Sequence, residues 1–464
     1  MSLTEEVAAF VCGFTWDDTS PEVVGIALDH IIDTVGVMLA GALEPVTRLV
    51  TAVYGLADGK ATVVGNRERA APALAALVNG TAGHALDYDD TQLSTSPQAV
   101  YGLLTHPSTP TLAAALAVAE DGDASGQGLL LGYLVGVEVA CRLADAANPR
   151  HYQAGFHSTG TIGTLGAAAA AASVLGLDER RTRTCLGVAA SMASGLRENF
   201  GTMTKPLHAG RAAHNGVLAA LLAREGFTSS PDILEAPRGF FNATAGGFDP
   251  GKVSGCLGRP FFFKTPGVSI KPYPSGSLGH PAMDLALELA TAADLKADDV
   301  DSIVVGTNAN VPNALIYNQP RTGLEAKFSL PYCVATCILR RSGGLADFTD
   351  EAVQDPAVQA LLRRVTVEVD PELEALGYQH VRTRLRISTT DGRVLQGQAD
   401  APRGYPDKPL SEEDLRSKFL ECSAPLLGST APDFYNQLRS LPKVDHVRSV
   451  FHVARLRAHA SADM

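Results

Sequence analysis

The sequence has little positive charge for its length. Its 464 residues carry 38 Lys and Arg against 50 Asp and Glu, which gives a formal net charge of −12. No basic face balances this excess, and we therefore expect no nucleic-acid partner. An anionic substrate is not excluded, because a few local lysines can reverse the field inside a pocket.

The sequence also lacks the cysteine pairs of a zinc site and the start of a secreted protein. None of its seven cysteines forms a CxxC pair, so we expect buried free thiols in a reducing compartment. The first residues, MSLTEE, lack the basic-then-apolar order of a signal peptide. We therefore expect a cytoplasmic protein. The charge-free segment 158–177 is rich in Ala, Gly and Thr, which favours a closely packed buried helix, and we expect no membrane partner.

The first 266 residues show helical spacing of apolar positions and no strand-like alternation. Ser20 as N-cap and Pro21 at the first helical position mark the start of one helix, and Asp178 caps another. A chain of this length exceeds one ordinary core, so two domains are expected. The predicted helices of this region are 21–33, 70–79, 109–120, 126–144, 160–177, 178–194 and 210–226.

The pattern changes after residue 266. Short β-branched or alternating segments predict strands at 300–307, 364–369, 383–390 and 393–399, and Asp391-Gly392 predicts a hairpin turn between the last two. Helical patterns at 281–293 and 329–340 lie between them. We predict a mostly α protein with an α+β second domain: a large all-helical domain (1–266), a smaller α+β lid domain (267–403) and C-terminal helices (404–464) that return to the helical domain.

Five polar segments stand out from this apolar background. They lie near predicted helix starts or at the entry to the second domain, and three of them carry His106, His157 or His208 near a helix N-terminus. Free N–H groups there bind anions, and histidine is suited to proton transfer near neutral pH. The segments are 79–91 with Asp87, Asp90 and Thr91; 105–108 with His106; 155–160 with His157; 204–210 with Lys205 and His208; and 270–281 with Lys271, Ser275 and His280.

Other interpretations of these residues remain open. A single histidine at a helix start is often only a cap, and aspartates often serve turns. Asp87, Asp90 and His84 have helical spacing and could hold a divalent ion. We rank this metal site below proton transfer next to a carboxylate. No second metal motif accompanies it, and the sequence has few aromatic residues to shield the carbocation that a terpene-type, metal-assisted ionisation would form.

Taken together, the segments resemble the MmgE/PrpD family. The matching pieces are GHALDYDDT (83–91), His106-Pro107, GFH (155–157), TKPLHAG (204–210), KPYP (271–274) with His280-Pro281, and KFSLPY (327–332). The family includes 2-methylcitrate dehydratase, cis-aconitate decarboxylase and iminodisuccinate epimerase. The resemblance implies a homodimer, a small anionic carboxylic-acid substrate, and no metal or organic cofactor.

The resemblance also implies roles for individual residues. His106 and His157 would be the acid/base pair, with Asp87 and Lys205 completing the catalytic set. Asp87 would orient a neighbouring histidine, as in triad logic, and the lysines would stabilise the charge that develops on the substrate. The substrate-binding set would be Thr91, Lys271, His208, Tyr317, Ser275 and His280.

Two departures from the family pattern affect the expected reaction. The decarboxylase has a histidine shortly after its lid lysine, where this chain reads Ser275-Gly276-Ser277, and this disfavours decarboxylation. The segment between Asp90 and His106 is long, so the pocket mouth is expected to differ. We expect first a dehydratase of a small di- or tricarboxylic hydroxy acid, then a dicarboxylate epimerase, then a cis-aconitate-type decarboxylase; the non-enzyme alternative is a helical binding or scaffold protein.

Overall fold

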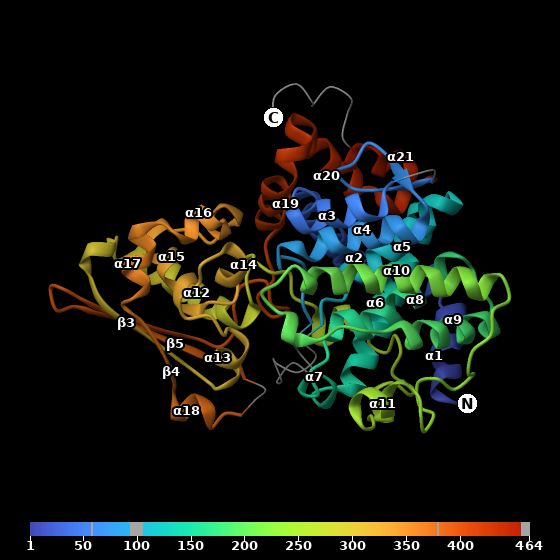
Figure 1. Cartoon of the computed structure of the whole chain (residues 1–464), viewed down its shortest axis with the longest axis horizontal. Helices are drawn as coiled ribbons and strands as arrows, with labels where there is room; N and C mark the ends of the chain where they lie inside the picture. Colours follow the sequence, from blue (N-terminus) through green and yellow to red (C-terminus); the bar gives the residue numbers. More distant parts are fainter. Residues whose placement is uncertain (57–58, 93–104, 378–379, 456–464) are drawn as a thin grey trace. The chain divides into compact units, whose positions relative to one another are not determined.

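The computed structural model describes residues 1–56, 59–92, 105–377 and 380–455 (Figure 1). The described residues form two compact units. The first contains 1–92, 105–268 and 411–455, and the second contains 269–377 and 380–410. The chain therefore returns to the first unit after completing the second. The predicted fold class is confirmed: the first unit is helical, and the second combines helices with a small mixed sheet.

The first unit is a stack of helices whose central members are buried along most of their length. A two-stranded ribbon of β1 (Ala61–Thr62) and β2 (Arg69–Ala70) is its one regular sheet among the described residues. Its helices are α1 (Leu3–Gly13), α2 (Pro21–Gly41), α3 (Pro45–Tyr54), α4 (Pro72–Ala85), α5 (Ser108–Gly122), α6 (Gly126–Ala147), α7 (Arg150–Gln153), α8 (Ser158–Val174), α9 (Glu179–Met192), α10 (Thr204–Arg224), α11 (Phe240–Ala245), α19 (Glu412–Leu427), α20 (Ala431–Arg439) and α21 (Arg448–Phe451).

The predicted helix starts are confirmed where a side-chain cap marks them. The Ser20 side chain accepts a hydrogen bond from the backbone of Val23, and Asp178 accepts one from Arg181. The prediction of a helix start at residue 210 is wrong, because α10 begins at Thr204. Pro206 lies in the first turn of that helix, where its missing N–H costs no hydrogen bond. Lys205 and His208 are therefore helical residues and do not lie in a preceding loop.

Helices α4 and α10 cross in close contact through two glycines. A Cβ on Gly80 would lie 2.9 Å from the Cα of Gly210, and a Cβ on Gly210 would lie 2.1 Å from Thr81 Oγ1. Only glycine permits this approach without displacing the backbone. The crossing brings the C-terminal end of α4 to the N-terminal end of α10, and these two ends carry His84 and Lys205.

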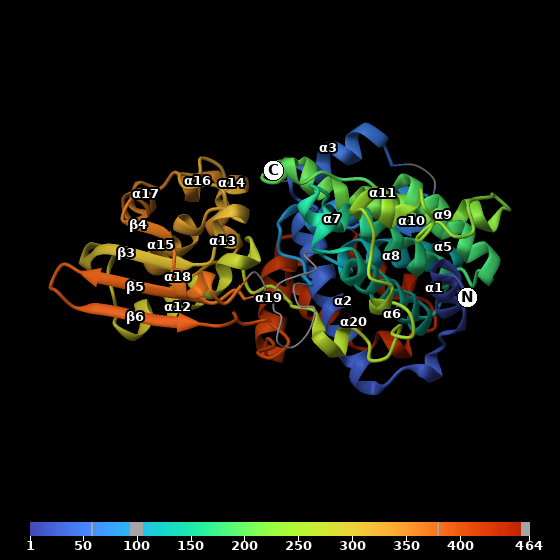
Figure 2. The ribbon, with the colours of Figure 1, turned by 90° about the horizontal axis from the view of Figure 1, so that it is seen from below.

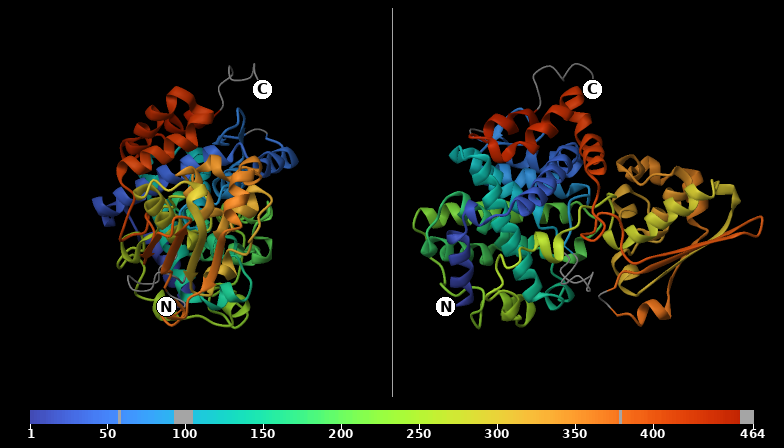
Figure 3. Two further views of the ribbon diagram at one scale, coloured as in Figure 1. Left: turned by 90° about the vertical axis from the view of Figure 1, so that its left-hand side faces the viewer. Right: turned by 180° about the vertical axis from the view of Figure 1, so that it is seen from behind.

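The C-terminal helices complete the first unit. Helix α19 packs on α2, and in Figure 3 the red C-terminal helices lie against helices drawn in blue. Helix α2 is long and apolar enough to cross a membrane, but 78% of its apolar window is buried within the structure. This degree of burial is typical of a core helix of a globular protein.

The second unit is built on a four-stranded sheet in the order β4-β3-β5-β6 (Figure 2). β3 pairs with β4 in parallel and with β5 in antiparallel orientation, and β5 and β6 form the predicted hairpin. Helices α12 and α15 pack on the sheet. The elements are β3 (Val300–Thr307), β4 (Val365–Val369), β5 (Thr383–Thr389), β6 (Val394–Ala399), α12 (His280–Ala292), α13 (Asn310–Ala314), α14 (Gly323–Ala326), α15 (Leu330–Arg340), α16 (Asp350–Val353), α17 (Pro356–Leu362) and α18 (Pro371–Glu374).

Candidate active site

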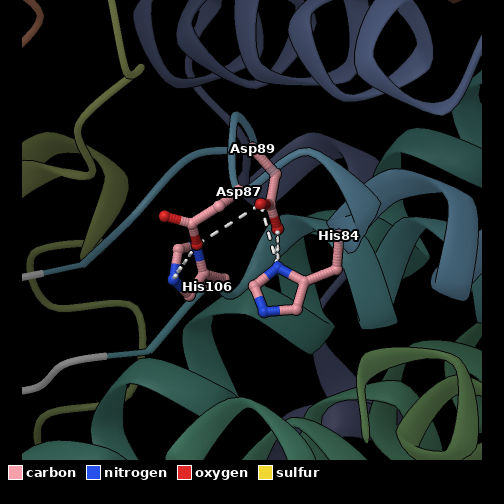
Figure 4. Close-up of side chains that lie close together, drawn as sticks. All are labelled: His84, Asp87, Asp89 and His106. Carbon is pink, nitrogen blue, oxygen red and sulfur yellow. Dashed lines mark hydrogen bonds and ion pairs between the residues drawn. The ribbon is translucent and has the colours of Figure 1, made fainter. Parts of the chain in front are cut away.

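A buried polar cluster forms in the first unit where the ends of four helices meet. α4 ends with His84 in its last turn, His106 lies just before α5, His157 is the N-cap of α8, and Lys205 is the second residue of α10. These helices pack on one another. Figure 4 shows His84, Asp87, Asp89 and His106 converging from α4, the turn after it and the segment before α5.

Asp87 forms an ion pair with Lys205 inside this cluster. The Nζ atom of Lys205 lies 2.5 Å from Asp87 Oδ1, and both residues are 5% exposed. Asp87 has φ of +52°, in the left-handed region that Asp adopts more readily than most side chains. Unusual backbone angles of this kind are often found at functional sites. Here the turn brings the carboxylate of Asp87 to the N-terminus of α10.

Asp89 holds His84 in a defined orientation. The two carboxylate oxygens of Asp89 lie 2.9 and 3.0 Å from His84 Nδ1, and Thr109 Oγ1 donates a 2.7 Å hydrogen bond to the same carboxylate. On its other side His84 Nε2 lies 3.0 Å from Lys205 Nζ. The sequence argument did not select either residue for catalysis, and it named His84 only as a possible metal ligand.

His106 presents one ring nitrogen as a proton acceptor. Its Nδ1 lies 2.8 Å from the backbone oxygen of Asp90. A carbonyl can only accept, so Nδ1 carries the proton and Nε2 keeps its lone pair. Burial lowers the pKa of His106 to about 3, although the carboxylate of Asp89 acts in the opposite direction. His106 is therefore neutral near pH 7, and its Nε2 lies 3.9 Å from Asp87 Oδ1.

His157 and His208 form a pair of neutral imidazoles. Their Nδ1 atoms lie 3.1 Å apart, so one donates to the other. Burial, followed by the positive charge of Lys205, holds the pKa of His157 well below its ordinary value and lowers that of His208 to about 4. Both histidines are therefore bases at neutral pH. The division of acid and base roles between His106 and His157 stays a prediction.

Asp90 points away from this cluster into a second buried network. Its carboxylate accepts from Ser108 and lies 2.7 Å from His30 Nδ1. Ser108 in turn lies 2.5 Å from the hydroxyl of Tyr133. Thr91 is buried directly after Asp90. The long segment noted after Asp90 falls largely on residues 93–104, which lie outside the described residues.

Four side chains of the cluster have a spacing that could accommodate a metal ion. One ligand atom each from His84, Asp87, Asp89 and His106 lies within 4.8 Å of the others. However, Lys205 already places an ammonium group against Asp87 and His84. The chain itself therefore supplies positive charge at this point. Asp90, which the sequence suggested as a ligand, is not part of the group.

The remaining predicted site residues belong to the second unit. Lys271 and Ser275 are buried there. Both lower the pKa of the Cys333 thiol, but burial outweighs them and raises that pKa to about 12. His280, the first residue of α12, lies with its Nε2 3.1 Å from the backbone oxygen of Ser275. Tyr317 is partly exposed, and its backbone N–H donates to the oxygen of Phe328. Their substrate-binding roles stay predictions.

Comparison with known proteins supports a family assignment over nearly the whole chain. Residues 5–252 match the MmgE/PrpD N-terminal domain, and residues 273–433 match the MmgE/PrpD C-terminal domain. The chain is 30% identical to cis-aconitate decarboxylase of Homo sapiens, over 92% of this chain and 89% of that protein. Identity to the cis-aconitate decarboxylase of Mus musculus is also 30%, over 92% and 88% of the two chains. The Aspergillus terreus cis-aconitate decarboxylase is 25% identical, over 90% and 88%.

Proposed function

The chain belongs to the MmgE/PrpD family and is a lyase of that family, and we propose that it decarboxylates cis-aconitate or a tricarboxylic acid of similar shape. The observation that carries this choice is the 30% identity to cis-aconitate decarboxylases over 92% of the chain. Membership of a lyase family also speaks against the alternative of a non-catalytic scaffold.

The buried cluster of the first unit supports this chemistry. Loss of CO2 leaves an electron pair that spreads over the neighbouring double bond and carboxylate, and a proton must then be added to carbon. Lys205 supplies positive charge and N–H groups, while neutral His106 and His157 do not add further charge. In a site shielded from water, such a fixed cation stabilises the developing negative charge strongly.

Dehydration of a 2-hydroxy tricarboxylic acid is the second candidate, and one observation favours it. His106 Nε2, which keeps its lone pair, and the ammonium of Lys205 both lie near Asp87 Oδ1, at 3.9 and 2.5 Å. A dehydratase needs this combination, because one group removes a proton from carbon and another protonates the leaving hydroxyl. The Ser275-Gly276-Ser277 departure also favours dehydration over decarboxylation.

The test is proton and carbon NMR of the purified protein in D2O with EDTA present. Cis-aconitate, citrate, 2-methylcitrate and iminodisuccinate are supplied separately. Decarboxylation is expected to convert cis-aconitate into a C5 dicarboxylate with one deuterium on carbon and to release CO2. Elimination of water from citrate or 2-methylcitrate would favour the second candidate. Exchange of an α-proton without a new product would indicate an epimerase, and no change in any acid would contradict both proposals.

A further inference from the structure

The ammonium of Lys205 is held between two acceptors in the first unit. Its Nζ lies 2.5 Å from Asp87 Oδ1 and 3.0 Å from His84 Nε2. An ammonium group has three N–H bonds and no lone pair, so Lys205 donates in both contacts. The contact with His84 therefore requires that its Nε2 carry a lone pair instead of a proton.

Asp89 enforces that requirement. Both of its carboxylate oxygens lie within 3.0 Å of His84 Nδ1, and an ionised carboxylate can only accept. The proton of His84 therefore sits on Nδ1, and Nε2 is left as the acceptor for Lys205. Thr109 fixes Asp89 in turn with a hydrogen bond of 2.7 Å. The order carboxylate, imidazole, reacting group is that of a catalytic triad, with lysine in the position of the nucleophile.

We propose that Asp89 and His84 are positioning residues that hold Lys205 as the proton donor of the reaction. The inference rests on the proposed function. In decarboxylation, the C–C bond to the leaving carboxylate breaks and its electron pair forms a new C=C bond. The electron pair of the former double bond moves to its far carbon and takes the proton there, as the Nζ–H bond of Lys205 breaks and a C–H bond forms. Lys205 is then a neutral amine, and it regains its proton from solvent, in step with the net consumption of one proton per CO2 released.

The same donor serves the dehydration alternative. The proton of Lys205 then passes to the leaving hydroxyl, which departs as water, while His106 Nε2 takes the proton from carbon. Both nitrogens lie near Asp87 Oδ1, His106 Nε2 at 3.9 Å and Lys205 Nζ at 2.5 Å. After the product leaves, His106 releases its proton to solvent and Lys205 takes one up, so that dehydration consumes no net proton. No histidine of the cluster needs to act as the acid.

The kinetic test uses Asp89→Asn, His84→Ala and His84→Gln, with cis-aconitate as substrate. Asp89→Asn allows His84 to place its proton on Nε2, and we expect kcat to fall at least ~100-fold with KM within about threefold of wild type. His84→Gln is expected to retain more activity than His84→Ala, because its amide oxygen can accept from Lys205. The control is His30→Asn, which breaks an equally buried His–Asp pair outside the cluster and should keep kcat within about threefold.

A second measurement does not depend on turnover. In protein with ¹⁵N-labelled histidine, the His84 signal, identified by its absence in His84→Gln, should report a neutral ring protonated at Nδ1. In Asp89→Asn we expect this signal to shift towards the Nε2–H form. A wild-type His84 protonated at Nε2 would overturn the relay, and so would equal losses of kcat in Asp89→Asn and His30→Asn. If the wild type leaves every acid of the panel unchanged, the proposed function fails, while the tautomer of His84 still decides the relay.

Discussion

Two adjacent aspartates of the first unit each pair with a buried histidine, but the two pairs face different regions. Asp89 binds His84 at 2.9 Å, and Asp90 binds His30 at 2.7 Å. The first pair continues to Lys205 and the histidine cluster. The second continues to Ser108 and Tyr133 and packs in the helical core. The chemistry of the two pairs is the same, so the groups beyond them decide which can act on a substrate.

The region of the second pair has the character of a scaffold. Lys418 on α19 lies 2.6 Å from Asp33 on α2 and donates to the backbone oxygen of Tyr88, in the turn that carries Asp87. The ring of Tyr88 also lies 3.9 Å from Lys418 Nζ. Removing one partner of a buried ion pair leaves an uncompensated charge, so such a pair constrains the residues that form it. We infer that this region holds the turn in place for the cluster.

The substitution with the largest expected effect removes the negative charge of Asp87, which lies next to Lys205 and His106. Asp87→Asn keeps the shape of the side chain but leaves the ammonium of Lys205 without its carboxylate. We expect kcat/KM to fall by on the order of 10³. Steady-state kinetics on the acid identified by NMR measures the loss. Asp178→Asn at the exposed N-cap of α9 is the matched control, because asparagine also caps helices; comparable activity in the two variants would contradict the role of Asp87.

His157→Ala tests the cluster from the side of α8. The family resemblance implies an acid/base role for His157, and loss of such a group should lower turnover at least ~100-fold. His151→Gln provides the comparison, since His151 is also buried but bonds to Thr161 and stacks on Phe156. We expect that control to retain its turnover. A His157→Ala protein with the native circular dichroism spectrum and near-normal turnover would show that His157 has no role in proton transfer.

His30→Asn should have the opposite profile, with a large effect on stability and a small one on rate. It breaks the buried pair with Asp90 and leaves a carboxylate short of one partner. We expect a loss of about 3 kcal/mol, seen in calorimetry as a fall in Tm of roughly 3 °C. Unchanged stability together with a large loss of turnover would reverse the assignment of the two pairs.

The two regions should also respond differently to acid. Burial lowers the pKa of His106 and His208 in the folded chain, so below pH 6.5 the unfolded chain binds more protons at these residues than the folded chain does. Stability should therefore fall as pH decreases below 6.5, by about 2 kcal/mol at pH 5 for a histidine with the pKa of His208. Burial raises the pKa of Asp33 to about 6. The folded chain therefore binds this proton more readily than the unfolded chain, and as pH falls from 6 to 3.8 Asp33 increases the stability of the fold and opposes the loss.

The acid response can be checked by recording Tm between pH 7.5 and 4.5. The wild type should lose stability over this range, and His208→Gln should lose less. Equal slopes for the two proteins would mean that His208 is not held neutral by the fold. Activity that depends on neutral His106 should persist well below the ordinary histidine pKa of about 6.5, for as long as the protein stays folded.

Local sequence patterns were sufficient to predict most of the helices and strands of the fold. The β-branched segment 300–307 forms β3 with the predicted ends, and the C-terminal segment is helical as predicted, with α19 beginning at a capping box of Ser411 and Asp414. The start of α10 was missed because Pro206 and Gly210 both suggested a break. In the folded chain the proline lies in the first turn, and the glycine lies at the crossing with α4, which only tertiary structure reveals.

The candidate site could be predicted only in part. Asp87, His106, His157 and Lys205 were selected from motifs, and the structure brings these four residues into one cluster. The direction of the three aspartates could not be predicted, because it depends on the positive φ of Asp87 and on where α5 begins. His84 and Asp89, five residues apart across that turn, were missed for the same reason.

The most direct test of the account follows ¹³CO2 released from carboxyl-labelled cis-aconitate by wild type and by Lys205→Ala, in the presence of EDTA. We expect the wild type to release label far faster than the uncatalysed background. Lys205→Ala should be at least ~1,000-fold slower, because it lacks the cation that Asp87 and His84 hold in the cluster. Equal release by the two folded proteins would contradict the central claim that this cluster performs the reaction.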